Sequence, residues 1–215
     1  MDISKEQARE SLSQIEEAAE RTKKMMACSG GDAIFILWGF IWVLGYLGTH
    51  FLLQNASWPR LMGAGWLWSV LVVAGVIITL VMVRRHMPVR SSVRSRLGKR
   101  ISRFWWLLFA YFYVWMVMLH PFIEVNGPGE AAALYIHLSA VAATVAMFAY
   151  VVVGLWLDHF MIWIGLGVTA LTVLGLFLLQ PYFCVWMAVA GGGTLIGTGL
   201  TIRNRWRQPC PASTS

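Results

Sequence analysis

Hydrophobic residues along the chain gather into six long apolar runs, which short polar or turn-rich segments separate. Between their ends these runs contain no Asp, Glu, Lys or Arg. A helix of about 20 apolar residues is long enough to cross the hydrocarbon layer of a membrane. The pattern therefore predicts six transmembrane helices, over residues 33–53, 61–83, 104–119, 131–157, 160–179 and 183–202.

The connections between the runs predict how the helices pair. Residues 54–59 (QNASWP) and 126–129 (NGPG) are rich in turn-forming residues, and residues 158–159 leave room for only a very short turn. Helices joined by short loops are antiparallel neighbours. We therefore expect an all-α polytopic membrane protein with six transmembrane helices arranged as three antiparallel hairpins.

The segment before the first run has a different pattern. Its weakly apolar positions follow the 4, 3, 4, 3, 4 spacing of a coiled-coil seam, at Ala8, Leu12, Ile15, Ala19, Thr22 and Met26. This predicts a cytoplasmic amphipathic helix and linker over 1–32, a membrane domain over 33–203 and a disordered cytoplasmic tail over 204–215. The helix can lie on its own domain or on the membrane, or residues 8–26 can form a seam with a second copy or a partner.

Composition supports the membrane assignment. Hydrophobic residues make up 58% of the chain and charged residues 13%, whereas soluble domains carry about 25% charged residues. The 12 tryptophans suit a protein with two membrane interfaces.

The net charge of +7 is unevenly placed. Every Lys and Arg except Arg60 lies within residues 1–28, 84–103 or 203–207, and six spans would put all three segments on one side. The positive-inside rule then places both termini in the cytoplasm. Because the positive charge is explained by topology, nucleic acid is not expected as a partner.

A short basic amphipathic helix is predicted in the linker after the second run. Val89, Val93, Leu97 and Ile101 recur every four residues, and basic side chains surround them. Such a helix lies in the headgroup layer and binds anionic lipids. The residues expected to bind anionic headgroups of the inner leaflet are Arg90, Arg94, Arg96, Lys99 and Arg100.

Three histidines fall in the outer third of the predicted membrane domain, at His50, His120 and His137, with Glu124 and Glu130 in the neighbouring loop. Imidazole and carboxylate groups together bind transition metals, and two facing imidazoles can hold a haem iron. The same residues can instead be interfacial side chains bonded to loops, or they can sense a ligand or pH.

Small residues at helical spacing indicate faces where helices meet closely. They occur at Gly45 and Gly48, at Ser139 and Ala143, and in the GxxxG pattern of Gly193 and Gly197. Packing within the bundle is the expected use. A broken sixth helix that lines a cavity and a dimer face are the alternatives.

Part of the chain resembles a group of small bacterial six-span inner-membrane proteins. The residues that carry the resemblance are 36–42 (ILWGFIW), 45–50 (GYLGTH), 182–187 (YFCVWM), 191–193 (GGG) and 202–203 (IR). The resemblance implies the six-span topology and the inner (plasma) membrane of a bacterium. It implies no site residues and no activity.

The motifs that the sequence lacks and the uncharged spans together narrow the possible functions. The chain has no GxSxG, HExxH or paired-carboxylate motif, which favours a non-enzymatic protein, although His120, Glu124 and His137 leave a lipid-modifying enzyme open. The uncharged spans argue against an ion-coupled transporter. The leading hypothesis is a subunit or sensor that acts through self-association or partner binding. The alternatives are a small permease or channel for a neutral or lipid-like solute, and a haem- or metal-binding protein that uses the outer-face histidines.

Overall fold

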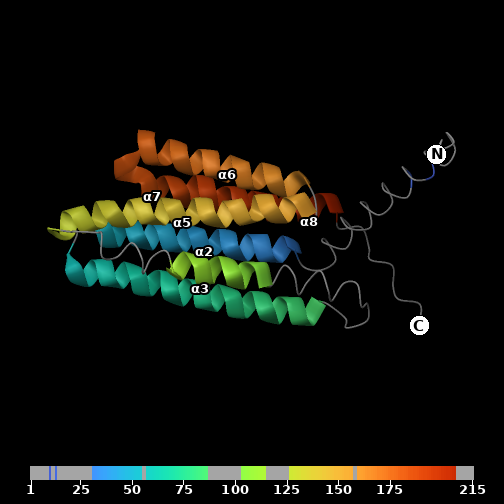
Figure 1. The fold of residues 1–215 in the computed structure, drawn as a ribbon, viewed down its shortest axis with the longest axis horizontal. Helices are drawn as coiled ribbons and strands as arrows, with labels where there is room; N and C mark the ends of the chain where they lie inside the picture. The colour runs from blue at the N-terminus through green and yellow to red at the C-terminus, as the bar shows by residue number, and fades with distance from the viewer. Residues whose placement is uncertain are drawn as a thin grey trace.

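The structure is a computed structural model of the 215-residue chain, and it describes Glu10, Ser13 and residues 31–54, 57–86, 103–114, 126–156 and 159–206. Within these ranges the chain is helical and contains no strand. The long helices lie side by side along one axis (Figure 1). The elements are α2 (Gly31–Leu53), α3 (Trp58–His86), α5 (Pro128–Trp156), α6 (His159–Leu178), the 3-10 helix η2 (Gln180–Tyr182), α7 (Phe183–Trp186), the π-helix η3 (Met187–Gly192) and α8 (Gly193–Trp206).

Five helical segments among the described residues are long and apolar enough to cross a membrane. They are α2, α3, α5, α6 and the composite segment Gln180–Asn204, which contains η2, α7, η3 and most of α8. The all-helical class of the prediction is confirmed, and the chain carries several helices that can span a membrane. Residues 103–114 are helical and include the first part of the third predicted span; the rest of that span lies outside the described residues.

Local chemistry sets where the helices start. Proline is favoured in the first helical turn because the amide it lacks would have no partner there. Pro59 and Pro128 both occupy such positions, in α3 and α5. At the start of α5, the Glu130 carboxylate accepts hydrogen bonds from the backbone and side-chain N–H groups of Asn126, at 3.0 and 3.3 Å. The predicted turn at 126–129 is therefore closed by its own capping carboxylate.

Helix ends differ by a few residues from the predicted spans. α2 begins at Gly31 rather than at residue 33, so Asp32 lies in its first turn, where a carboxylate interacts favourably with the helix dipole. α3 continues to His86, three residues beyond the predicted end. Its last turn includes Arg84 and Arg85, and cations are favoured at that end of a helix. α8 continues to Trp206, into the predicted tail.

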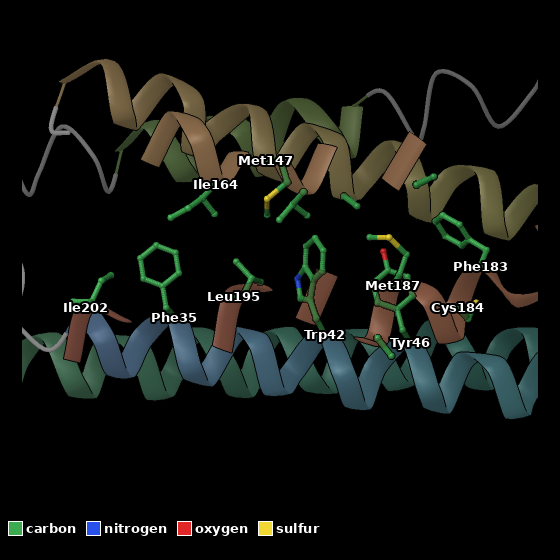
Figure 2. Close-up of a cluster of buried hydrophobic side chains, with 14 residues drawn as sticks. Phe35, Trp42, Tyr46, Met147, Ile164, Phe183, Cys184, Met187, Leu195 and Ile202 are labelled. Atoms are coloured by element: carbon green, nitrogen blue, oxygen red, sulfur yellow. The ribbon is translucent and has the colours of Figure 1, made fainter. Parts of the chain in front are cut away.

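α2 packs against α3 and against η3 and α8, α6 contacts η3 and α8, and α5 pairs with α6 and also touches α3. A single apolar core fills the space between α2, α5, α6 and the Phe183–Trp206 segment. In Figure 2, Phe35 and Trp42 of α2 and Leu195 of α8 point toward Met147 of α5 and Ile164 of α6. α3 lies against α2 at the side of this core.

The predicted amphipathic helix over 1–32 lies almost entirely outside the described residues. Glu10 and Ser13 are helical and exposed, and the Ser13 hydroxyl donates to the Glu10 carbonyl at 2.9 Å. The seam over 8–26 and the tail beyond residue 206 stay predictions.

Candidate functional site

The outer-face histidines were the most site-like prediction. His50 Nε2 lies 3.2 Å from Gln54 Nε2, one turn along the same helix. His137 Nδ1 lies 2.8 Å from the carbonyl oxygen of Ala133, again within its own helix. His120 lies outside the described residues. No group of three His, Cys, Asp or Glu side chains within the described ranges is placed to hold a metal ion. Haem or metal binding by His50, His120 and His137 stays a prediction.

Gly45 and Gly48 face α3. A Cβ built on Gly45 would lie 2.8 Å from the indole ring of Trp68, and one built on Gly48 would meet the side chain of Leu67. Gly75 of α3 has the reciprocal role, because an added Cβ there would meet Ile41 of α2. The large side chains of each helix therefore rest on glycines of the other.

Thr49 is the polar centre of the contact between α2 and α3. It is 1% exposed, and its hydroxyl donates to the Gly45 carbonyl at 2.7 Å. The same oxygen accepts from Trp68 Nε1 at 2.9 Å. The Thr49 hydroxyl and the Trp68 indole both have partners, and their bond joins α2 to α3.

A second indole bond joins the same two helices farther along. Trp38 Nε1 of α2 donates to Thr79 Oγ1 of α3 at 3.2 Å. In one bond the tryptophan comes from α2 and in the other from α3. The pair therefore fixes both the separation and the register of the two helices.

The α8 segment approaches α2 through glycines other than the predicted packing pair of Gly193 and Gly197. A Cβ on Gly39 would lie 2.9 Å from the Gly192 carbonyl oxygen, and one on Gly199 would lie 2.7 Å from the Asp32 carbonyl oxygen. Gly191 lies in the π-helix under the ring of Trp42, with ring carbons 3.1 Å from an added Cβ. Backbone meets backbone along this contact, and the π-helix lies inside it.

The pair of Gly193 and Gly197 lies on the opposite side of α8. Both glycines are exposed, and an added Cβ on either would have nothing within 4 Å. Val189 and Leu200, which are 70% and 44% exposed, lie on the same side of the segment. The GxxxG pattern therefore faces away from the bundle, and the α2 contact uses Gly192 and Gly199.

Ser139 and Ala143 lie on α5 near the core. Ala143 is buried in it, whereas the Ser139 hydroxyl donates to the Ile136 carbonyl at 2.8 Å within its own helix. The closest approach of α5 and α6 is at other residues. A Cβ on Gly165 would lie 2.7 Å from the Met147 carbonyl oxygen, and one on Gly154 would lie 2.8 Å from the Ile162 nitrogen.

α3 also has an uncovered face. A shallow hollow of about 360 Å³ lies along it. Its lining residues are Trp66, Ser69, Val70, Val73, Ala74 and Ile77. The predicted headgroup-binding residues of the following linker, from Arg90 to Arg100, lie outside the described residues.

No protein-family model matches the chain, no curated protein is similar enough to count as a relative, and no solved structure matches its fold.

Proposed function

We propose that this chain is a non-enzymatic integral membrane protein that acts by self-association within the membrane, through the outward face of α8. The observation that carries the proposal is the exposure of Gly193 and Gly197 with open space beside both. In lipid, helices associate by close van der Waals packing, and a small-xxx-small face allows two backbones to approach.

The position of this pair supports a second copy rather than an internal partner. The glycines of α8 that face the bundle, Gly192 and Gly199, already have α2 backbone against them. Each glycine in a helix interior costs about 1 kcal/mol relative to alanine. Two exposed glycines lower the stability of α8, and packing of another helix on them would offset that loss.

The side chains around the pair are suited to such a contact. Val189 and Leu200 are large and exposed, and they flank the glycines along α8. The Thr201 hydroxyl donates to the Gly197 carbonyl at 2.8 Å, so the face presents no unsatisfied hydroxyl to lipid. A ridge beside a glycine groove can interlock with its symmetry mate in a two-fold dimer.

We further propose that the chain lies in the bacterial inner membrane with six spans in three antiparallel hairpins and both termini in the cytoplasm. Arg84 and Arg85 at the end of α3 and Arg203 near the end of α8 support this orientation, because these helix ends lie at the same end of the bundle (Figure 1). Arg60 lies near the start of α3, at the opposite end.

The test is the variant Gly193→Leu/Gly197→Leu, compared with Gly167→Leu. Gly167 lies on α6, is exposed and also has nothing within 4 Å of an added Cβ. Photobleaching steps of a fluorescent fusion, counted in vesicles over a range of lipid dilutions, give the dissociation constant. We expect the double variant to raise that constant at least tenfold, or about 1.4 kcal/mol, and Gly167→Leu to leave it unchanged. Dimerisation of the double variant at the wild-type level would refute the proposal, as would equal weakening by Gly167→Leu.

A further inference from the structure

α3 is the least covered of the candidate spans. Only 6% of its most apolar 18-residue window is buried, against 28–50% for the other four. The hollow described above follows this uncovered face, and Trp66, Val70 and Ile77 in its lining are more than half exposed. Ser69 donates to the Gly65 carbonyl at 2.9 Å, so its hydroxyl is satisfied within α3. The hollow is thus a shallow apolar groove along the surface of α3.

A positive charge lies beyond the hollow, on the same face of α3. Residues seven apart on a helix return to nearly the same face, so Val70, Ile77 and Arg84 form one line. Arg84 lies about 10 Å beyond Ile77 at about 1.5 Å per residue. Arg85 follows directly, and both arginines are exposed.

Carboxylates of the described residues do not explain this charge. Those ranges contain three, of which Asp32 is only 6% exposed. Glu130 is bonded to Asn126 at the start of α5, and Glu10 lies before the first span. Within the described residues no carboxylate is recorded as a partner of Arg84 or Arg85, and an anionic headgroup can supply the opposite charge.

We infer that α3 binds an anionic phospholipid from the leaflet at the arginine end of the bundle. One acyl chain lies in the part of the hollow nearer the arginines, along Val73, Ala74 and Ile77, and the phosphate contacts Arg84 and Arg85. Each basic residue near an anionic headgroup strengthens binding by about fivefold. The apolar groove matches the acyl chain of this ligand, and the arginines beyond it match the phosphate.

A second copy of the chain fits this face less well. Copies inserted with the same topology and paired through α3 would bring Arg84 and Arg85 against their counterparts, and like charges in contact repel. A phospholipid brings the opposite charge to the same place. This inference is independent of the α8 face, which lies on a different helix.

Native mass spectrometry of the full-length chain, titrated with phosphatidylglycerol or phosphatidylcholine, tests the headgroup contact. We expect the first phosphatidylglycerol to bind at least tenfold more tightly than phosphatidylcholine. Arg84→Gln should weaken the binding of phosphatidylglycerol about fivefold, and Arg84→Gln/Arg85→Gln should weaken it about 25-fold. The control Arg203→Gln removes one exposed charge from the same end, on α8, and should change binding less than twofold.

Filling the hollow tests the acyl-chain contact. Ala74→Trp should weaken the first binding event of both lipids, whereas Val173→Trp, at an exposed position on α6, should not. The inference is overturned if Arg203→Gln weakens binding as much as Arg84→Gln, or if Ala74→Trp has no effect. A dimer that Ala74→Trp dissociates would assign this face to a second copy and would also overturn it.

Discussion

The backbone contact between α2 and α8 makes Gly39→Ala a severe test of the packing. The added Cβ would lie 2.6 Å from Ile196 Cγ1, 2.9 Å from the Gly192 carbonyl oxygen and 2.9 Å from the Ile196 nitrogen. The isoleucine side chain can rotate away, but the two backbone atoms cannot. The methyl group can be accommodated only if α2 and α8 separate by some tenths of an ångström.

Two opposing effects decide the size of the loss. Forcing an extra carbon into a well-packed contact costs about 1–3 kcal/mol. Alanine recovers up to about 1 kcal/mol because it is the better helix former. With that gain in full, we expect Gly39→Ala to lower the free energy of unfolding by up to about 2 kcal/mol, and to be about 1–3 kcal/mol less stable than an exposed glycine-to-alanine variant.

The assay is unfolding by sodium dodecyl sulfate in mixed micelles, followed by tryptophan fluorescence and far-ultraviolet circular dichroism at a dilution where the chain is monomeric. Gly167→Ala is the matched control, since its added Cβ meets nothing within 4 Å. We expect that variant to be as stable as the parent or up to about 1 kcal/mol more stable. If Gly39→Ala is as stable as Gly167→Ala, the close approach of α2 and α8 is wrong.

Combining Gly39→Ala with Gly192→Ala sharpens the test. The two added methyl groups lie in one contact, so a single separation of the helices relieves both. Their effects should therefore add to less than the sum of the single losses. Full additivity would mean that the two glycines do not share a contact.

Two further predictions concern other parts of the chain. The double-mutant cycle of Thr49→Val and Trp68→Phe should give a coupling energy of about 0.6 kcal/mol and at most about 1.7, the range for hydrogen bonds between membrane helices; purely additive losses would argue against the bond. Deletion of residues 1–28 should shift the chain to a smaller species in mild detergent if residues 8–26 form a seam between copies. Identical masses with and without the segment, measured by mass photometry, would remove the seam.

The helix positions could be predicted because polar and turn-forming residues interrupt the apolar runs. The Asn126–Gly129 turn and the prolines at 59 and 128 mark helix starts that the structure places within a few residues. The ends extend beyond the apolar runs, as α3 does through Arg84 and Arg85, because a helix gains from basic side chains in its last turn whatever their hydropathy. Hydropathy therefore locates the apolar run, and the ends depend on the chemistry of the flanking residues.

The π-helix at Met187–Gly192 carries no hydrophobic signal of its own. Its residues are as apolar as their neighbours, and Met187, Ala188, Gly191 and Gly192 are buried. A glycine run can adopt several backbone geometries, since it has no side chain to oppose them. Trp42 of α2, which is distant in sequence, contacts Gly191 within this π-helix.

The choice between two glycine pairs on α8 could not be made from the sequence. Gly192 and Gly199 face α2, whereas Gly193 and Gly197 face outward. In a soluble helix the polar positions would mark the outer face, but a membrane helix is apolar all round and its periodicity does not separate the core from lipid. The GxxxG pattern reports only that two backbones can meet. Which backbone meets it depends on how the other helices are arranged, and here the inner side of α8 is already occupied by α2. A GxxxG face left open on the outer side can accept a further helix, and our proposal is that a second copy supplies it.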